Sequence, residues 1–211
     1  MSKKTLYTVR IPTSDLKFSE SQLIDSGLKL LYREEDYFLS WFLLESQIIT
    51  LHESEQQHPC LVKYVADSPA TLDKLDELGI ASDFSADENG NHFEASFFDP
   101  GGTKILIADY VDIPKEVSNL ETKSSFEFSI PSNSDFKDSV NFWHLFGFSV
   151  FNNKAKPHAW SSLVDNEFRV AIHQHYEWSL PGLCFPSSSS IKKSQIDKAN
   201  LRSKLYFSDF F

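Results

Sequence analysis

The chain has 211 residues, of which 41% are hydrophobic and 24% charged, the composition of a globular protein with a substantial core. Its formal net charge of −10 excludes nucleic acid as a main partner, because phosphate binding needs a basic surface. Two cysteines are too few for a disulfide scaffold, and no apolar run approaches the roughly 20 residues of a membrane span. We therefore expect a cytoplasmic protein with reduced thiols, no signal peptide and no membrane partner.

The first 53 residues predict a strand, a helix and three further strands. Residues 5–15 form an apolar strand that ends in a Pro turn. The helix expected over 16–26 ends at Gly27, because a glycine just past a helix readily adopts the left-handed cap conformation. The three strands then follow at 28–32, 37–44 and 48–53.

The next unit, over 60–109, is a variant of the first. A strand at 61–65 precedes a helix that begins with Ser68-Pro69 as N-cap and N1 residues and ends at Gly79. The segment from His92 to Asp109 comprises two apolar runs joined by Asp-Pro-Gly-Gly. Pro sets φ for a turn and Gly accepts a positive φ, so this segment predicts a β-hairpin.

The same order of elements returns after the middle of the chain. The Ile-Pro turn at 130–131 repeats the one at 11–12, and the helix expected over 135–146 stops at Gly147. A third unit therefore spans about 124–175.

A fourth unit begins at about residue 182. Its helix is expected from Ile191 to Ser203, and a strand follows at 204–207. Two strands of the unit, including its hairpin, are missing, which would leave unpaired strand edges. Either another chain supplies them, as in a homodimer, or the second half packs differently, or the sequence is a fragment.

The four units and the Asp-Pro-Gly hairpin together resemble the vicinal oxygen chelate superfamily, which includes glyoxalase I, bleomycin-resistance proteins and extradiol dioxygenases. The resemblance implies an α+β fold of paired βαβββ modules that form half-open barrels, with an incomplete second domain. The alternative is an unrelated α+β sandwich. The implied domains, joined by a linker, are 4–112, with modules at 5–53 and 60–109, and 124–211, with modules at 124–175 and 182–211.

In metal-dependent members of that superfamily, His or Glu ligands lie on the first and last strands of each module, since Fe, Mn, Ni and Zn favour imidazole and carboxylate there. In the first domain the resemblance carries these positions to Thr8, Thr50, Cys60 and Leu106, none of which is His or Glu. In the second domain it carries them to Glu127, Ala171 and about Pro181, with the fourth missing. We therefore expect no metal cofactor. The alternative is a divalent transition metal held by Glu127, His173 and His175, because the two histidines share one face of a strand.

Strand alternation extends this set of inward positions. If Thr8, Thr50, Cys60 and Leu106 face inward, so do Arg10, His52, Tyr64 and Lys104. The eight side chains would line a ligand cavity, in which Arg10 and Lys104 hold a carboxylate or phosphate and His52 or Tyr64 acts as acid or base. The alternatives are that the charged residues only pair with acidic neighbours, and that Cys60 is either a nucleophile or a packing residue. A register shift of one residue would turn every one of them outward.

The leading functional prediction is a metal-free protein of this superfamily that binds a small organic ligand in a concave β-sheet cleft. One alternative is a metal-dependent lyase, isomerase or dioxygenase, and another is a dimerising structural or interaction protein. The sequence contains no Ser-His-Asp elbow, phosphate-binding Gly loop or dinucleotide fingerprint that would favour another enzyme class, and no catalytic residue is assigned.

Overall fold

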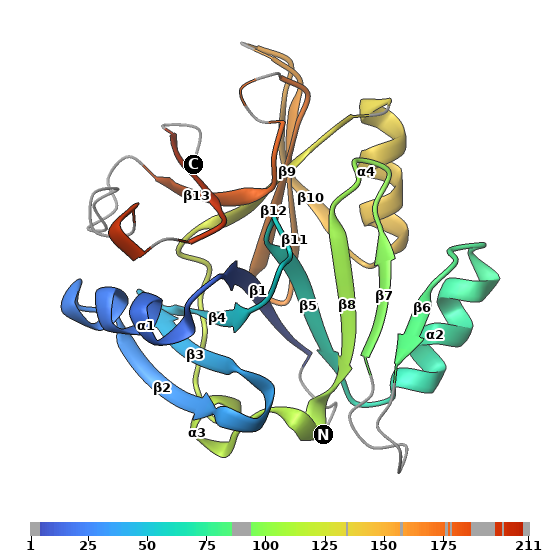
Figure 1. Ribbon diagram of the computed structural model, residues 1–211. Helices are drawn as coiled ribbons and strands as arrows, with labels where there is room; N and C mark the ends of the chain where they lie inside the picture. Colours follow the sequence, from blue (N-terminus) through green and yellow to red (C-terminus); the bar gives the residue numbers. More distant parts are fainter. Residues whose placement is uncertain are drawn as a thin grey trace.

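The computed structural model describes residues 5–85, 94–133, 135–156, 158–175, 177, 179–186, 197–199 and 201–208. This part of the chain forms two open sheets, of eight and six strands, with a few helices (Figure 1). The strand order is β2-β3-β4-β1-β5-β8-β7-β6 in the first sheet and β10-β11-β12-β9-β13-β14 in the second. The α+β fold class expected from the sequence is therefore confirmed. No helix of the described residues has the length and apolar character needed to cross a bilayer.

The first sheet contains the elements that the first two units predict. Helix α1 (Leu16–Asp25) stops before Gly27, which has a φ of +89°. Helix α2 (Ser68–Glu77) begins one residue earlier than expected, because its N-cap is Asp67 rather than Ser68. The strands are β1 (Leu6–Thr13), β2 (Lys29–Glu34), β3 (Leu39–Leu44), β4 (Gln47–Glu53), β5 (Cys60–Val65), β6 (Asp83–Ser85), β7 (Glu94–Phe98) and β8 (Lys104–Asp109), with a 3-10 turn, η1 (Glu35–Tyr37), before β3.

The predicted hairpin is formed by β7 and β8. The carboxylate of Asp99 accepts a hydrogen bond from the Thr103 amide at 2.7 Å, and the Asp99 amide donates to the Thr103 carbonyl at 3.0 Å. The indole N–H of Trp143, in the second half of the chain, donates to the same carboxylate at 3.1 Å. The turn is therefore tied both to itself and to the other half of the molecule.

The second sheet repeats the topology of the first. In both sheets the first strand pairs in parallel with the last strand of its own unit and antiparallel with the first strand of the next unit. Helix α4 (Phe136–Leu145) takes the place of α1. The strands are β9 (Glu127–Pro131), β10 (Ser149–Lys154), β11 (Trp160–Asp165), β12 (Phe168–His173), β13 (Gly182–Pro186) and β14 (Lys204–Ser208).

The position of β14 differs from the expectation. It runs parallel to β13, as β8 runs parallel to β5, so it corresponds to the last strand of a unit rather than to its second strand. The strands that have no counterpart in the described part of the second sheet are therefore those equivalent to β6 and β7. The helix expected from Ile191 to Ser203 lies largely outside the described residues, and Asp197–Ala199 form a 3-10 turn, η4.

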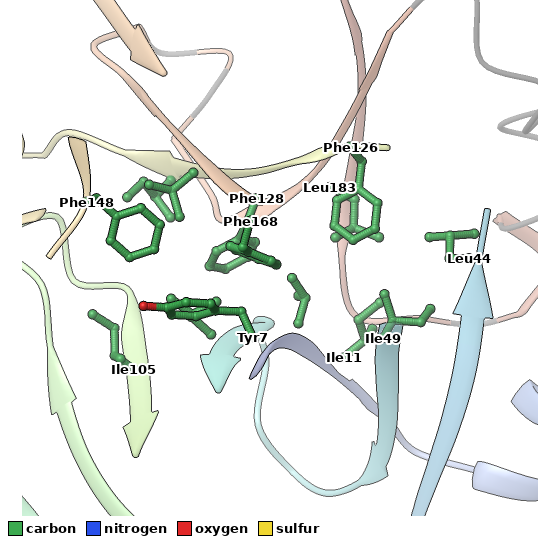
Figure 2. Packing of buried hydrophobic residues seen from close by; sticks show 14 of the residues in the cluster. Tyr7, Ile11, Leu44, Ile49, Ile105, Phe126, Phe128, Phe148, Phe168 and Leu183 are labelled. Atoms are coloured by element: carbon green, nitrogen blue, oxygen red, sulfur yellow. The ribbon is translucent and has the colours of Figure 1, made fainter. Parts of the chain in front are cut away.

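One buried cluster joins the facing sides of the two sheets with helices α1, α2 and α4. Figure 2 shows Ile49 of the first sheet and Leu183 of the second within this cluster, with Tyr7 beside Phe168. The rings of Tyr7 and Phe168 stack with centroids 5.3 Å apart, and the Tyr7 and Phe148 rings are 5.4 Å apart. Burial of this apolar surface is the main force that holds the sheets together, and it leaves the opposite face of each sheet available for other contacts.

The segment expected to be a linker is folded. It follows the 3-10 turn η2 (Tyr110–Asp112), which lies at the end of the predicted first domain, and contains the short helix α3 (Lys115–Ser118). Ile113 and Val117 are buried in a second apolar cluster, on the side of the first sheet that faces away from the main core. The segment therefore packs onto the first sheet as part of it.

Candidate functional site

All eight predicted ligand residues lie on the face of the first sheet that points away from the main core. Arg10 pairs with Thr50 on one side and Cys60 on the other, while their chain neighbours Val9, Ile11 and Leu61 enter the main core. We call this the Arg10 face, and define it by Thr8, Arg10, Thr50, His52, Cys60, Tyr64, Lys104 and Leu106. The four strands that carry these residues, β1, β4, β5 and β8, thus follow the alternation on which the prediction was based.

The floor of the Arg10 face is buried. Five of the eight side chains have exposures of 4% or less, and three of these belong to the second apolar cluster together with Trp41 and Val62. His52 and Lys104 are only half-buried. The polar groups at the rim are therefore the ones that solvent reaches. The five buried residues are Thr8, Thr50, Cys60, Tyr64 and Leu106.

Arg10 reaches across this floor. Its Nη2 lies 2.7 Å from Oε1 of Glu94, which is on β7, two strands beyond the neighbouring β5. Burial opposes the charge of Arg10, but Tyr64 and Glu94 outweigh this effect and raise the pKa of the guanidinium. Burial also raises the pKa of Tyr64 to about 12, against the opposing influence of Arg10. Arg10 is therefore a fixed cation, and Tyr64 is a neutral phenol beside it.

His52 at the rim and Cys60 on the floor are neutral as well. Burial and the nearby charge of Arg10 lower the pKa of His52, so its imidazole carries no proton charge at pH 7. Burial raises the pKa of the Cys60 thiol. A raised pKa removes the thiolate that a nucleophile needs, which favours the packing interpretation of Cys60.

Four buried polar atoms, three on the Arg10 face and one on the adjacent Trp41, have no hydrogen-bond partner within the described chain. A buried polar group left unpaired costs about 1–3 kcal/mol, so folded proteins pair nearly all of them with protein, water or ligand. Three belong to neighbours in one row across the strands, because Thr50 pairs with both Trp41 and Arg10. The row thus places three polar groups without partners in the described chain side by side on one face. The atoms are Thr8 Oγ1, Arg10 Nε, Trp41 Nε1 and Thr50 Oγ1.

Sequence reasoning missed Trp41 and Glu94. Both follow from alternation once strands β3 and β7 are paired, because Trp41 faces Thr50 and Ser96, two residues from Glu94, faces Leu106. The ion pair of Glu94 with Arg10 had no signal in the sequence, because it depends on the reach of a long side chain across two strands.

A pocket of about 500 Å³ lies at the rim of the Arg10 face. Lys104 and Phe98 are paired across the hairpin and line it, together with the loop at 56–59 and residues 179–181 from the second half of the chain. Within the described chain Lys104 has no acidic side chain at ion-pair distance. Among the described residues, the rim therefore combines a cation that has no ion-pair partner with an exposed aromatic ring.

The four superfamily positions on this face do not fit a transition metal. They supply two hydroxyls, one thiol with a raised pKa and one alkyl group, instead of imidazole and carboxylate. Throughout the described residues, no group of three His, Cys, Asp or Glu side chains is placed to hold a metal ion.

The corresponding face of the second sheet carries Glu127. Glu127 pairs with Cys184, and Cys184 with Tyr206 on β14. Because Thr8, Val62 and Leu106 form the same row in the first sheet, the fourth superfamily position is not missing but is occupied by Tyr206, and the third is Gly182 rather than Pro181. We call this the Glu127 face, and define it by Glu127, Ser129, Ser162, Ala171, His173, Gly182, Cys184 and Tyr206.

The structure brings together two of the three residues of the alternative metal site. Nε2 of His158 lies 3.1 Å from Nδ1 of His173, and the rings of His158 and His175 are 4.8 Å apart. Burial lowers the pKa of His173 to about 2, so it is neutral. Glu127 lies apart from them, because the strand partner of His173 is Pro131, four residues further along β9. Its carboxylate accepts a hydrogen bond from the Ser162 hydroxyl, and burial raises its pKa to about 7.

No family model and no curated protein matches the chain, but solved structures do. The Mn(II)-bound glyoxalase from Novosphingobium aromaticivorans is 15% identical, with a TM-score of 0.55 over 94% of this chain and 69% of that one. A homoprotocatechuate 2,3-dioxygenase from Brevibacterium fuscum is 13% identical, with a TM-score of 0.57 over 94% of this chain and 60% of that one. A catechol 2,3-dioxygenase is 13% identical, with a TM-score of 0.59 over 92% of this chain and 73% of that one.

These likenesses establish the fold. Glyoxalases and extradiol dioxygenases are both members of the vicinal oxygen chelate superfamily, so the chain has the fold of that superfamily, as its repeated units predict. The chain spans 60% to 73% of the length of these three structures.

Proposed function

We propose that the chain binds a small organic anion on the Arg10 face, without a metal. The observation that carries the proposal is the row of buried polar atoms that lack partners in the described chain, led by Trp41 Nε1, Arg10 Nε and Thr50 Oγ1. Each buried polar atom without a hydrogen-bond partner lowers the stability of the fold by about 1–3 kcal/mol. Several such atoms on one face are therefore expected only where a bound group forms hydrogen bonds with them.

The chemistry of the row favours a ligand that accepts hydrogen bonds. An indole N–H and a guanidinium N–H are donors only, and a threonine hydroxyl donates readily. Lys104 adds a positive charge at the rim pocket, where Phe98 offers an apolar surface. A carboxylate or phosphate on an aromatic or aliphatic body matches this combination of donors, charge and ring.

We keep two further expectations within this proposal. The division into domains at 4–112 and 124–211 agrees with the fact that each range holds one of the two sheets. The metal-dependent lyase, isomerase or dioxygenase remains the alternative function, since the structural neighbours include an Mn(II)-bound glyoxalase. Elemental analysis of protein purified without chelator separates the two, because a stoichiometric transition metal would overturn the metal-free proposal.

The direct test is calorimetric titration with benzoate and phenyl phosphate, and with neutral benzamide for comparison. Wild type should bind one of the two anions saturably and benzamide at least tenfold more weakly. Thr50→Val should weaken anion binding, because it removes one hydroxyl of the row with little change of shape. The matched control is Thr103→Val, since Thr103 Oγ1 is also buried and unpartnered in the described chain but lies in the hairpin turn. Equal loss in both variants, or no binding of either anion, would contradict the proposal.

A further inference from the structure

We propose that a pocket beside helix α1 is a second binding site, separate from the Arg10 face, and that it takes a free α-amino acid with an apolar side chain. Helix α1 lies beside β2 at one edge of the first sheet (Figure 1). The pocket between α1, the end of β2 and the turn η1 has a volume of about 610 Å³, which is within the range of small-molecule sites. We call it the α1 pocket. Leu16 and Leu23 of α1 enter the main core, so this helix and the Arg10 face lie on opposite sides of the sheet.

Helix α1 supplies one wall of the α1 pocket. Residues four positions apart in a helix lie on the same face, and two neighbouring rows of α1 follow this spacing. In the first row Leu16 and Glu20 are buried, whereas Ile24 is 45% exposed. The wall therefore combines apolar surface, a buried carboxylate and exposed polar groups. The two rows are Leu16, Glu20 and Ile24, and Lys17, Ser21 and Asp25.

The buried carboxylate of Glu20 holds Arg33 in a fixed position. Glu20 accepts hydrogen bonds from the Ser40 hydroxyl and from Nε and Nη2 of Arg33, with Nε 3.0 Å from both carboxylate oxygens. Arginine carries five N–H donors in a planar fork, so this contact engages only one of its edges. Within the described chain Nη1 of Arg33 has no hydrogen-bond partner, and the side chain is 44% exposed. The outer edge of the fork is therefore oriented to bind a carboxylate through two parallel hydrogen bonds.

Glu35 places a negative charge beside that arginine. Hydrogen bonding with Glu20 raises the pKa of the Arg33 guanidinium against the effect of burial, and the charges of Glu20 and Glu35 raise it further. No Lys or Arg of the described residues lies at ion-pair distance from Glu35. The two remaining charges of the pocket, Lys17 and Asp25, are of opposite sign. A ligand that carries both a carboxylate and an ammonium group therefore matches the pocket better than an anion or a cation alone, and an α-amino acid carries both on one carbon atom.

Phe38 provides apolar surface for the side chain of the amino acid. Its ring is 59% exposed, and its φ of +50° lies in the left-handed region that favours glycine. Hydrogen bonds hold this conformation, since the Phe38 amide donates to the Glu35 carbonyl at 3.2 Å and the Phe38 carbonyl accepts from the Glu53 amide at 3.1 Å. A large aromatic residue thus stands where glycine would be less strained, which indicates a role for its ring. Together with Ile24 on α1, this ring favours an apolar ligand body.

The test is calorimetric titration of the whole chain with L-phenylalanine and with three analogues that each lack one recognised group. 3-Phenylpropanoate lacks the ammonium group, phenethylamine lacks the carboxylate, and glycine lacks the apolar body. Wild type should bind L-phenylalanine saturably and each analogue at least tenfold more weakly. Equally tight binding of 3-phenylpropanoate or phenethylamine would overturn the inference, as would the absence of L-phenylalanine binding.

Two variants locate the binding in the α1 pocket. Glu35→Gln should weaken L-phenylalanine binding about threefold to tenfold, because it removes the charge that pairs with the ammonium group. Asp36→Asn makes the same change at the next residue, outside the pocket lining, and should have no effect. Phe38→Gly removes the ring but suits the positive φ, so it should fold and should weaken binding about tenfold. Glu45→Gly is its matched control, because Glu45 has a φ of +53° in the turn between β3 and β4, away from the pocket.

L-Phenylalanine also carries a carboxylate, the group that the Arg10 face binds, so the two sites are separated by their own variants. Thr50→Val should leave L-phenylalanine binding unchanged, whereas Glu35→Gln and Phe38→Gly should leave benzoate binding unchanged. Binding of L-phenylalanine that resists both Glu35→Gln and Phe38→Gly, or that is lost in Thr50→Val, would overturn the inference. None of these results bears on the anion site, because benzoate is titrated separately.

Discussion

Tyr7 donates a hydrogen bond to Asp165 across the interface between the two sheets, although the residues are 158 positions apart in the chain. Lys63 Nζ lies 3.9 Å from the same carboxylate and 4.5 Å from the centroid of the Phe146 ring. Burial and the charge of Asp165 raise the pKa of Tyr7, so its phenol stays a donor at every physiological pH. A charged group is thus held at the edge of an aromatic core that contains parts of both sheets.

We expect Tyr7→Phe to destabilise the protein by about 1–3 kcal/mol, because it removes a hydrogen bond to a charged acceptor that is only partly solvated. Urea denaturation followed by circular dichroism measures the change. Tyr32→Phe is the control, since Tyr32 is 39% exposed and its substitution should stay within about 0.5 kcal/mol. A loss for Tyr7→Phe no larger than for Tyr32→Phe would show that this contact does not stabilise the interface.

We expect Thr50→Val and Thr103→Val each to stabilise the ligand-free protein by about 1 kcal/mol. Both substitutions replace a buried hydroxyl that has no partner in the described chain with a methyl group of similar size. Thermal unfolding without ligand measures this as a raised Tm. A lowered Tm for Thr50→Val would mean that an ordered water already satisfies its hydroxyl in the free protein, and would remove the main support for the anion site.

The stability of the protein should fall as pH rises from about 4 to about 6. Burial raises the pKa of Asp99 from 3.8 to about 6, although the Thr103 amide and the Trp143 indole act in the opposite direction. In that pH range the folded state retains a proton that the unfolded state has released. Each rise of one pH unit therefore lowers the free energy of unfolding by up to about 1.4 kcal/mol. The raised pKa of Glu127 has the same effect: it lowers the stability of the protein as pH rises from about 4.5 to about 7.

The variant that isolates this effect is Asp99→Asn, which keeps an oxygen to accept the Thr103 and Trp143 hydrogen bonds. Urea denaturation at half-unit pH steps should show a shallower decline for the variant than for wild type. Parallel curves would mean that Asp99 is ionised in the folded protein throughout this range.

The sequence carries much of this fold because local signals repeat. Helices end at Gly27, Gly79 and Gly147 as predicted, since these positions take a positive φ. Alternation also indicates which side chains share a face, because the period of two is fixed by strand geometry. The register places all eight predicted residues on one face, from Thr8 on β1 to Leu106 on β8.

The sequence does not predict which strands pair when they are far apart in the chain. The parallel pairing of β14 with β13 cannot be read from the residues at 204–207, which suit any strand of the unit. The rim pocket depends on residues 179–181 meeting the hairpin from the other half of the chain. The ion pair of Arg10 with Glu94 crosses two strands, so no spacing rule predicts it.

That ion pair leads to the sharpest prediction for the anion site. Glu94 neutralises Arg10 at 2.7 Å and competes with an incoming anion for the guanidinium. Glu94→Gln should therefore tighten benzoate binding about threefold to tenfold, with little loss of stability because Glu94 is 36% exposed. Glu77→Gln on α2 makes the same change of net charge at an exposed position away from this face, so it controls for long-range electrostatics. Calorimetric titration of benzoate into the three proteins compares them directly. Unchanged or weaker binding by Glu94→Gln would mean that Arg10 serves only to pair with Glu94, and that the anion, if bound, is held by Lys104 alone.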